Sequence, residues 1–440
     1  MLDYWHTAEW QYIRKDEMTL TEQGYLPRLI DLKIEKYQRL FGALSIEGPK
    51  WCGKTWTALN HAKSVIYMLD PENDYANRES ARLNPASILG GEKPLLIDEW
   101  QEVPGIWDAI RFASDRTREK GLFLLTGSVT PPEGAHIHSG AGRIARIRMR
   151  PMSLFESGDS QNCASLRSLF GGGVVEPGAS KLTQERLIGL LTRGGWPGNI
   201  DIPIDDAGIL PEQYITALAE TDITHTDNVK RNPALVLHLL AALSRTNATT
   251  ATLNTITADV QARFGDVTRQ TVSGYLYALK RLYVIEEIPQ WFPELRDRLR
   301  LRKAQKRMLV DPSIAVSAMK ARPDELARDP RTLGGLFENL CLRDLLIYAE
   351  ALGAKLSHYH DNNGLEVDAI LELDNRWAAM EIKLGAHRIN EGAEALKKIS
   401  QKLQSKGAPP PAFTAVLTGG GPAHTRKDGI HVLPIDCLQP

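Results

Sequence analysis

The chain has 440 residues, 42% of them hydrophobic and 24% charged, and its 53 lysines and arginines nearly balance its 54 aspartates and glutamates. This composition excludes a disordered or collagen-like protein, and the length predicts about three domains, each with its own core. Four scattered cysteines argue against a disulfide scaffold or a zinc site, and the lack of a long apolar run and of a secretory leader predicts a cytoplasmic protein without membrane contact.

Residues 1–160 are predicted to form an open α/β sheet. Apolar segments that suit strands begin at residues 44, 64, 94 and 121, and helical sequence follows the first of them at 56–63. Continuous apolar runs, rather than alternating ones, are typical of parallel strands that helices cover on both faces. We therefore expect a parallel sheet at the centre of this region.

Residues 161–230 are predicted to form a helical lid on the first domain. Glycine-rich breaks at 171–173 and 194–198 lie on either side of a helical stretch, and the sequence from residue 211 onward is again helical.

Residues 231–315 are predicted to form a winged-helix segment. A helix at 268–282 is followed by strands at 284–288 and 298–302, which is the order of elements in such a segment. Winged helices contact DNA in some proteins and act only as spacers between protein partners in others. Both interpretations fit the sequence.

Residues 316–440 are predicted to form a second α/β domain. The segment offers a long helix, two strands, a second helix and a third strand, at residues 336–351, 367–371, 377–383, 392–403 and 414–418. The fold class that we expect is therefore α/β, with a parallel sheet, a helical middle part and a C-terminal α/β domain.

A phosphate-binding loop (P-loop) is predicted between the first strand and the first helix. The segment Gly48-Pro49-Lys50-Trp51-Cys52-Gly53-Lys54-Thr55 matches the pattern G-x-x-x-x-G-K-[ST] in full. The glycines let backbone N–H groups surround phosphates, Lys54 reaches the β- and γ-phosphates, and the Thr55 hydroxyl ligates Mg²⁺ at a helix N-terminus. The alternative is a plain glycine-rich turn, but the flanking strand and helix favour ATP and Mg²⁺ as ligands.

Two carboxylates end the apolar strand that begins at residue 94. Asp98 is expected to hold the Mg²⁺ ion, and Glu99 to orient and activate the water that attacks the γ-phosphate. An acidic strand end alone is a weak signal. Here, however, the strand comes after a P-loop, with one helix and one further strand between them. We therefore predict that the two motifs form one site.

Three further residues are candidates for contact with the γ-phosphate. Thr126 and Ser128 follow an apolar strand, where their hydroxyls either sense the γ-phosphate or satisfy a backbone turn. Arg143 lies in the run 142–150, which holds four arginines and no acid. It either reaches the nucleotide of a neighbouring subunit in a homo-oligomer or belongs to a charged edge strand.

A second group of carboxylates lies in the C-terminal domain. Asp368 lies in one strand, and Glu381 and Lys383 follow in the next, on one face because side chains alternate along a strand. Asp368 and Glu381 are candidates to share a Mg²⁺ ion, with Glu338 from the preceding helix completing its shell and Lys383 activating a water. The alternative is a simple ion pair between Glu381 and Lys383.

These motifs resemble those of the AAA-type ATPases that carry a DUF4143 domain. The likeness rests on the P-loop and on segments 25–28, 96–101, 124–128, 142–143, 151–156, 194–197, 310–312, 366–368 and 381–383, and so covers nearly the whole chain. It implies an ASCE-type P-loop ATPase core, a winged-helix segment and a C-terminal domain similar to PD-(D/E)xK nucleases. Lys50, Trp51 and Cys52, inside the loop, depart from the family pattern.

Three functions are compatible with these features. The first is an ATPase whose hydrolysis drives a conformational switch, the second is a Mg²⁺-dependent nuclease regulated by ATP, and the third is a nucleotide-gated protein-binding module. The paired acids Asp98 and Glu99 favour the first, since a switch that only binds nucleotide has less need of a second carboxylate.

The net charge of −1 is the sum of opposed patches. Residues 296–307 hold seven lysines and arginines with one aspartate, whereas residues 201–227 hold seven acids and no lysine or arginine. The basic patch falls in the predicted winged-helix hairpin and keeps DNA as a candidate partner.

Overall fold

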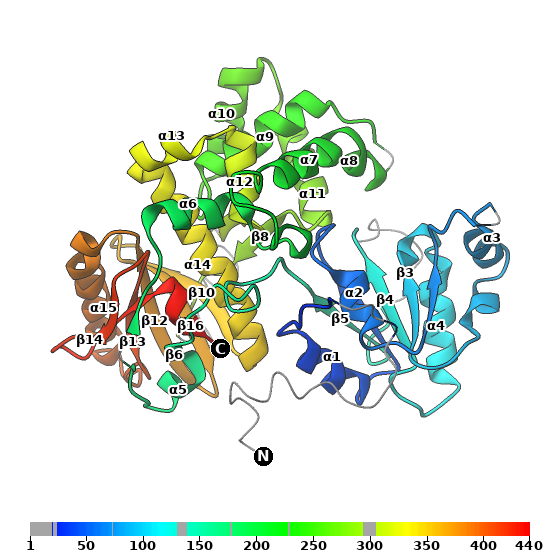
Figure 1. Cartoon of the computed structure of the whole chain (residues 1–440), viewed down its shortest axis with the longest axis horizontal. Coiled ribbons are helices and arrows are strands. Elements are labelled where there is room, and N and C mark those ends of the chain that lie inside the picture. The colour runs from blue at the N-terminus through cyan, green and yellow to red at the C-terminus, as the bar shows by residue number, and fades with distance from the viewer. Residues whose placement is uncertain are drawn as a thin grey trace.

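The computed structural model describes residues 20, 24–72, 74–129, 139–176, 178–227, 229–293 and 305–440. Within these ranges the chain forms a parallel-sheet domain, a helical middle region and a C-terminal domain built on a mixed sheet (Figure 1). The middle region lies at the top of the view in Figure 1, above and between the other two. No helix in the described part of the chain is long and apolar enough to cross a membrane.

The parallel-sheet domain contains five strands in the order β2-β3-β4-β1-β5, and every strand pair is parallel. Its main elements are α1 (Asp31–Gln38), β1 (Ala43–Glu47), α2 (Lys54–Leu59), β2 (Ser64–Tyr67), α3 (Ala76–Leu83), β3 (Leu95–Asp98), α4 (Gly105–Asp115), β4 (Phe123–Gly127) and β5 (Ile144–Arg148). Leu96 and Leu124 belong to one hydrophobic cluster, and their neighbours Leu95, Ile97 and Leu125 belong to another. The strands are thus covered on both faces, and the predicted parallel sheet is confirmed.

The parallel arrangement brings the carboxyl ends of the strands to one edge of the sheet. The P-loop follows the end of β1, Asp98 ends β3, and Gly127 ends β4 beside them. In open α/β sheets this edge is where ligands bind, because loops and helix N-termini gather there.

The middle region is mainly helical. Its elements are α6 (Gln184–Arg193), α7 (Ile209–Ala217), the π-helix η4 (Leu218–Asp222), α8 (Ile223–His225), α9 (Pro233–Arg245), α10 (Leu253–Phe264), α11 (Arg269–Arg281), β8 (Ile285–Ile288), β9 (Lys306–Leu309), α12 (Pro312–Met319) and α13 (Pro323–Arg328). The side chains of Asn232, Thr252 and Thr268 cap α9, α10 and α11, so residue type sets where these helices begin.

A two-stranded hairpin follows these helices, in the predicted order. β8 pairs with β9 in antiparallel fashion, with Ile285 opposite Leu309. The strand predicted at 298–302 lies outside the described residues, and the partner of β8 is instead the segment immediately after it. The assignment of this region as a winged helix remains a prediction.

The C-terminal domain contains a seven-stranded sheet in the order β10-β11-β12-β13-β15-β14-β7. Its elements are α14 (Pro330–Leu352), β10 (Lys355–His360), β11 (Glu366–Leu373), β12 (Arg376–Lys383), α15 (Ile389–Gln404), β13 (Thr414–Thr418), β14 (Pro422–Thr425), β15 (His431–Pro434) and β16 (Leu438–Gln439). β10, β11 and β12 are antiparallel, whereas β12, β13 and β15 are parallel. The five predicted elements are present in the predicted order, but the structure adds β10 before the strand pair and β14 and β15 after β13, which the sequence did not predict.

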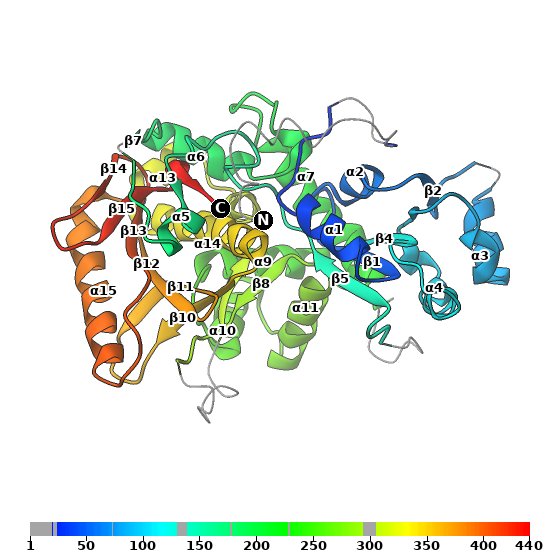
Figure 2. The ribbon, with the colours of Figure 1, turned by 90° about the horizontal axis from the view of Figure 1, so that it is seen from below.

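Part of the segment expected in the lid lies with the C-terminal domain. β6 (Ala164–Ser165) pairs with β16, and β7 (Gly178–Ala179) pairs with β14 at the edge of the mixed sheet. The short helix α5 (Leu166–Phe170) lies between them. Of this segment, α7 and η4 reach the P-loop through Tyr214 and Asp222, and the name lid refers below to α7, η4 and α8. Figure 2 shows α5, β7 and β14 on the same side of the molecule, away from α1 and α2.

A buried ionic network joins the three regions. Arg343 on α14 donates to Asp311 (2.8 Å) and to Asp344 (2.7 Å). Asp311 also accepts the backbone N–H of Gly195 in the loop after α6 (3.0 Å), and Asp344 accepts that of Leu154, just after the parallel sheet (2.9 Å). Each of these charges has a partner, as burial requires, and the network fixes the regions relative to one another.

The arginine run at 142–150 lies partly at a second junction. Arg148 and Arg150 each lie 2.9 Å from Glu286 on β8, and Arg150 also pairs with Glu350 on α14 at 2.8 Å. Burial alone would raise the pKa of Glu286, and the charges of the two arginines hold it below its usual value. These two arginines therefore belong to an interface between β5 and the hairpin.

Candidate functional site

The P-loop adopts a conformation that its glycines make possible. A Cβ atom on Gly48 would lie 2.2 Å from the carbonyl oxygen of Met149, and Gly53 has a φ of +98° immediately before α2. Trp51, a non-glycine residue, has a φ of +64° at the tip of the loop. The backbone N–H groups at the start of α2 are thus free of side-chain caps and available to an anion.

Lys54 and Thr55, the first residues of α2, make the contacts that prepare the site. The Lys54 ammonium is buried and donates to the carbonyl oxygen of Pro49 at 2.8 Å. The Thr55 hydroxyl donates to Asp98 Oδ1 at 2.7 Å, and the Thr126 hydroxyl donates to the same oxygen at 2.6 Å. Burial raises the pKa of Asp98, and the charge of Glu99 adds to the rise. Thr126 therefore positions Asp98 and does not line the cavity described below.

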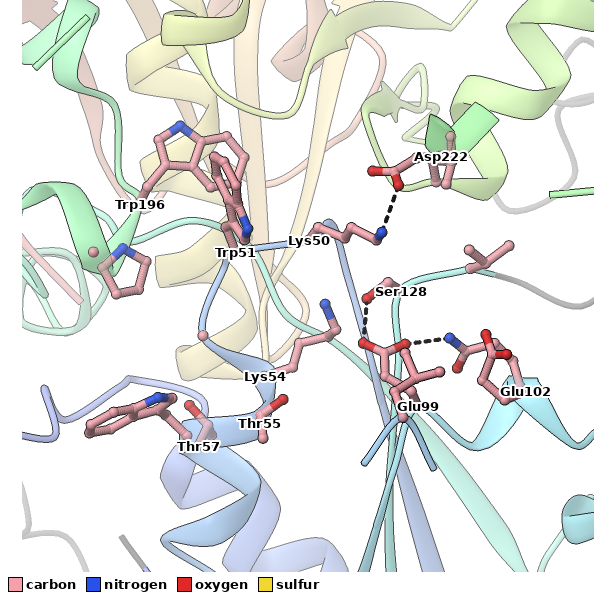
Figure 3. A pocket seen from close by; sticks show the side chains of 18 of the residues that line it. Lys50, Trp51, Lys54, Thr55, Thr57, Glu99, Glu102, Ser128, Trp196 and Asp222 are labelled. Atoms are coloured by element: carbon pink, nitrogen blue, oxygen red, sulfur yellow. Dashed lines mark hydrogen bonds and ion pairs between the residues drawn. The ribbon is translucent and has the colours of Figure 1, made fainter. Parts of the chain in front are cut away.

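Glu99 is held by two side chains at the end of β3. Ser128 donates to Glu99 Oε1 at 3.0 Å, and the Gln101 side-chain amide donates to Oε2. Glu99 itself has a φ of +56°, a left-handed conformation that turns the chain away from the strand. The carboxylate is thereby fixed beside Asp98 and faces the same cavity as Lys54 (Figure 3).

A cavity of about 1350 Å³ lies against these residues. Seven of the predicted site residues line it, namely Lys50, Trp51, Gly53, Lys54, Thr55, Glu99 and Ser128. The other predicted residues of the P-loop and of the β3 and β4 ends lie behind this lining, namely Gly48, Pro49, Cys52, Asp98 and Thr126. Asp222 and Thr226, from the lid and the turn after it, and Arg281 of α11 complete the wall, so the cavity lies between two regions of the chain.

The three residues that depart from the family pattern connect the P-loop to its surroundings. Lys50 forms a 2.6 Å ion pair with Asp222 of η4, as Figure 3 shows. The rings of Trp51 and Tyr214 of α7 are 5.6 Å apart. Cys52 is buried in the core. The side chains of the loop tip thus contact the lid directly.

The loop after α6 supports this contact. The Trp196 ring lies 4.9 Å from Tyr214, and its indole N–H donates to Ser313. A Cβ on Gly53 would lie 3.2 Å from Pro197 Cγ, so this loop also closes over the base of the P-loop. The Gly-Gly-Trp-Pro motif is therefore part of the nucleotide site, a role that the sequence did not reveal.

Arg28 joins the segment before the sheet to the P-loop. Its buried guanidinium donates to the carbonyl oxygens of Cys52 (2.8 Å) and Arg150 (2.7 Å) and pairs with Glu156 at 3.1 Å. Burial alone would lower the pKa of the Arg28 guanidinium, but the charge of Glu156, together with Cys52 and Tyr25, raises it above its usual value. Arg28 also lines the cavity described above, and its hydrogen bonds to Cys52 and Arg150 hold the loop in place.

Arg143 lies far from the nucleotide site of its own chain. It precedes β5, whose first residue Ile144 pairs with Ala43 at the start of β1, whereas the P-loop follows the end of β1. Its guanidinium donates to Asp115 of α4 at 2.7 Å. Its predicted role can therefore operate only across a subunit boundary.

The structure also brings together the C-terminal residues singled out in the sequence. Lys383 lies 2.7 Å from Glu381 and 4.0 Å from Asp368, and the backbone N–H of Ile382 donates to Asp368 at 2.9 Å. Glu338 of α14 faces the same point, and the name carboxylate cluster below refers to Glu338, Asp368 and Glu381. Burial and the neighbouring Asp368 raise the pKa of Glu338 to about 7 and that of Glu381 to about 8.

A second cation in this cluster, besides Lys383, is a lysine that the sequence did not single out. Lys306 of β9 places its ammonium 2.7 Å from Glu338 and 3.2 Å from Asp368. Within the described ranges, no three acidic, histidine or cysteine side chains form a group that could hold a metal ion. The predicted Mg²⁺ ligands are thus close together, but an ammonium lies where the ion was expected.

The site geometry defines the class of protein. A P-loop after β1, a carboxylate that ends β3 and bonds the P-loop threonine, and a second carboxylate beside it are the features of a P-loop ATPase. Three family models match the chain, an AAA domain at residues 41–157, a domain of unknown function (DUF8612) at 184–325 and a domain of unknown function (DUF4143) at 333–438. The chain belongs to the AAA-type P-loop ATPases that carry a DUF4143 domain.

Two mycobacterial proteins are similar to the chain over most of its length. They are Rv2008c of Mycobacterium tuberculosis and Mb2031c of Mycobacterium bovis, both described as uncharacterized. Each is 26% identical over 345 residues, which cover 77% of this chain and 69% of the relative.

Two solved archaeal structures are distantly similar. The Walker-type ATPase PABY2304 of Pyrococcus abyssi is 13% identical, with a TM-score of 0.42, over 69% of this chain and 99% of that protein. The signal transduction ATPase PH0952 of Pyrococcus horikoshii is 10% identical, with a TM-score of 0.20, over 89% of this chain and 57% of that protein. Likeness of this degree supports no statement about substrates or partners.

Proposed function

We propose that the chain hydrolyses ATP with Mg²⁺ and that the nucleotide state moves the lid relative to the parallel-sheet domain. The observation that carries this proposal is the shared cavity. Its wall combines Lys54, Thr55 and Glu99 from the sheet domain with Asp222 and Arg281 from the middle region. A ligand in this cavity would contact both regions at once.

The residues present suit a nucleotide triphosphate with Mg²⁺. The backbone N–H groups at the start of α2 would receive the phosphates, and Lys54 would exchange the neutral Pro49 carbonyl for phosphate oxygens. Thr55 and Asp98, already in contact at 2.7 Å, supply the hard oxygen donors that Mg²⁺ prefers. Bound there, Mg²⁺ would neutralise charge on the phosphates.

Glu99 is the group that we assign to activation of water. Attack of a water oxygen on the γ-phosphorus forms one P–O bond and breaks the bond to the ADP oxygen, which releases ADP and inorganic phosphate. The water proton passes to Glu99, whose carboxylate Ser128 and Gln101 hold in place.

The contacts of the P-loop tip would transmit the nucleotide state. Lys50 bonds Asp222, and Trp51 packs on Tyr214, so a shift of the loop on phosphate binding displaces or releases the lid. Since η4 and α7 are continuous, both contacts act on one rigid piece of the lid.

Glu99→Gln tests the chemical assignment, with Glu102→Gln as the matched control. Both acids line the cavity, but only Glu99 is held by Ser128. We expect Glu99→Gln to bind ATP normally and to lower kcat by about 10²-fold or more, the contribution of a general base, while Glu102→Gln keeps its activity. Equal kcat for both variants would refute the assignment.

A Mg²⁺-dependent nuclease activity is the weaker candidate. It would need Glu338, Asp368 and Glu381 as ligands, and the Lys306 ammonium lies among them. DNA contact through the hairpin, a cytoplasmic location and a homo-oligomer that uses Arg143 remain predictions. Constant specific activity across a dilution series that dissociates any oligomer would exclude the role of Arg143.

A further inference from the structure

The ammonium group of Lys306 lies inside the carboxylate cluster of the C-terminal domain. Its distances are 2.7 Å to Glu338, 3.2 Å to Asp368 and 3.8 Å to Glu366, and its side chain is 2% exposed. A lysine so deeply buried requires compensating charge, which these carboxylates provide. The contact is therefore a built ion site and differs from an exposed surface pair.

The backbone around Lys306 fixes its position. Leu309 on the same strand accepts a hydrogen bond from Asn339, the neighbour of Glu338 on α14, at 2.9 Å. Leu309 also donates to Asn247 at 3.0 Å, and Asn247 in turn donates to Asn339 at 2.8 Å. β9 is thus clamped against the helix that carries Glu338, which holds the backbone of Lys306 beside the cluster.

Two further carboxylate oxygens of the cluster also have partners within the protein. Asp368 Oδ2 accepts the N–H of Ile382, and Glu381 pairs with Lys383 at 2.7 Å. A Mg²⁺ ion needs several oxygen ligands at about 2.0–2.1 Å in octahedral geometry. Lys306 occupies the space between Glu338 and Asp368 that such an ion would need.

We propose that the resident cation of this cluster is the chain's own Lys306 ammonium, and that the cluster becomes a site for a divalent cation only when Lys306 is removed or withdrawn. The ammonium neutralises the carboxylates and fastens the β8–β9 hairpin to the C-terminal domain. This inference is independent of ATP hydrolysis, since it concerns residues outside the nucleotide cavity.

The test compares Mn²⁺ binding and melting temperature in the nucleotide-free full chain. Mn²⁺ is a suitable probe because carboxylates bind it well. We expect no Mn²⁺ response in the wild type. Lys306→Met keeps the aliphatic length but removes the charge, so it should melt several degrees lower, bind about one Mn²⁺ ion and recover stability when Mn²⁺ is added.

Two controls separate the cluster from other effects. Lys306→Met combined with Asp368→Asn should lose the Mn²⁺ response, because a ligand is missing. Lys280→Met, which removes a half-exposed lysine paired with Glu287, should behave like the wild type.

Two results would overturn the proposal. The first is Mn²⁺ binding by the wild type that Asp368→Asn abolishes, which would show a metal site despite Lys306. The second is a Lys306→Met chain that is as stable as the wild type and binds no Mn²⁺. If Lys306→Met does not fold, the comparison of the wild type with Asp368→Asn tests the proposal instead. The absence of a Mn²⁺ response in both proteins would support it. A response in the wild type that Asp368→Asn lacks would refute it.

Discussion

Lys54 and Lys306 are both buried lysines close to carboxylates, and they differ in how the ammonium group is satisfied. In the nucleotide site, Lys54 donates to one neutral carbonyl and lines a large cavity. In the C-terminal domain, Lys306 is surrounded by carboxylates and is almost fully buried. The first lysine can exchange its partner for a phosphate at small cost, whereas the second cannot leave without exposing buried charges.

This difference separates a site prepared for a ligand from a site already filled. The P-loop amides, Lys54 and the Thr55–Asp98 pair all face space that a nucleotide can occupy. The carboxylate cluster has its cation within the protein. Similar residue types therefore serve ATP hydrolysis in the nucleotide site, and in the carboxylate cluster they hold the β8–β9 hairpin against the C-terminal domain.

The largest expected effects come from exchanging the two lysines for neutral residues. Lys54→Ala should lower ATP hydrolysis by about 10²–10³-fold, the usual loss for a group that stabilises transition-state charge, and leave the melting temperature nearly unchanged. Lys306→Met should do the opposite, with a loss of about 3–5 kcal/mol in stability and intact ATP binding. Phosphate release, calorimetric binding and thermal unfolding measure these effects. If both variants lost the same property, the distinction between the sites would fail.

The connection between the middle region and the parallel-sheet domain is expected to depend on Gly195, in the loop after α6. A Cβ atom there would lie 2.1 Å from the Met152 carbonyl oxygen, whereas one on Gly198 in the same loop would meet nothing within 4 Å. Gly195→Ala should therefore cost about 3 kcal/mol of unfolding free energy through overpacking, and Gly198→Ala should cost well under half of that. Denaturant unfolding of the two variants compares them directly, and equal stability would show that the contact relaxes freely.

The carboxylate cluster should also make the stability of the chain depend on pH. The pKa of Glu381 is raised to about 8, mainly by burial and by the charge of Asp368. A carboxyl group whose pKa is higher in the folded chain than in the unfolded chain stabilises the fold at low pH. This stabilisation is lost as pH rises from about 4.5 to about 8. Glu381→Gln should flatten the fall in unfolding free energy over this range, by on the order of 2 kcal/mol.

Glu394→Gln is the control for this pH effect. Glu394 is exposed on α15 and pairs with Lys397 at 2.9 Å. Its removal should leave the wild-type pH profile intact. A Glu381→Gln profile that matches the wild type would show that Glu381 titrates normally.

The smallest expected effect concerns the contact between P-loop and lid. Lys50 is nearly half exposed, so its pair with Asp222 should contribute less than about 1 kcal/mol to stability. A double-mutant cycle of Lys50→Ala and Asp222→Asn, measured on the affinity for ATP, tests whether the pair transmits nucleotide binding. If the effects of the two substitutions on ATP affinity are additive, the pair does not transmit nucleotide binding to the lid.

The parallel-sheet domain could be predicted well from the sequence because its signals are local. The P-loop pattern and the apolar run that ends in Asp98 and Glu99 specify both the residue types and the strand ends that place them. Thr126 lies beside the site, where its hydroxyl contacts Asp98 and does not line the cavity.

The rest of the site depends on contacts between distant segments that no local pattern specifies. Asp222 and Trp196 reach the P-loop only because the lid folds back over the sheet. Lys306 lies 32 residues before Glu338 and appeared in the sequence only as one member of a basic run. A lysine in such a run looks exposed, and only the clamping of β9 on α14 buries it.

The most direct test of the central claim is phosphate release from ATP by the purified wild-type chain with Mg²⁺, compared with Lys54→Ala under the same conditions. We predict that the wild type releases phosphate in many turnovers per chain and that Lys54→Ala releases it about 10²–10³-fold more slowly. A wild-type chain that binds ATP but releases no phosphate, or equal rates for the two proteins, would contradict the account.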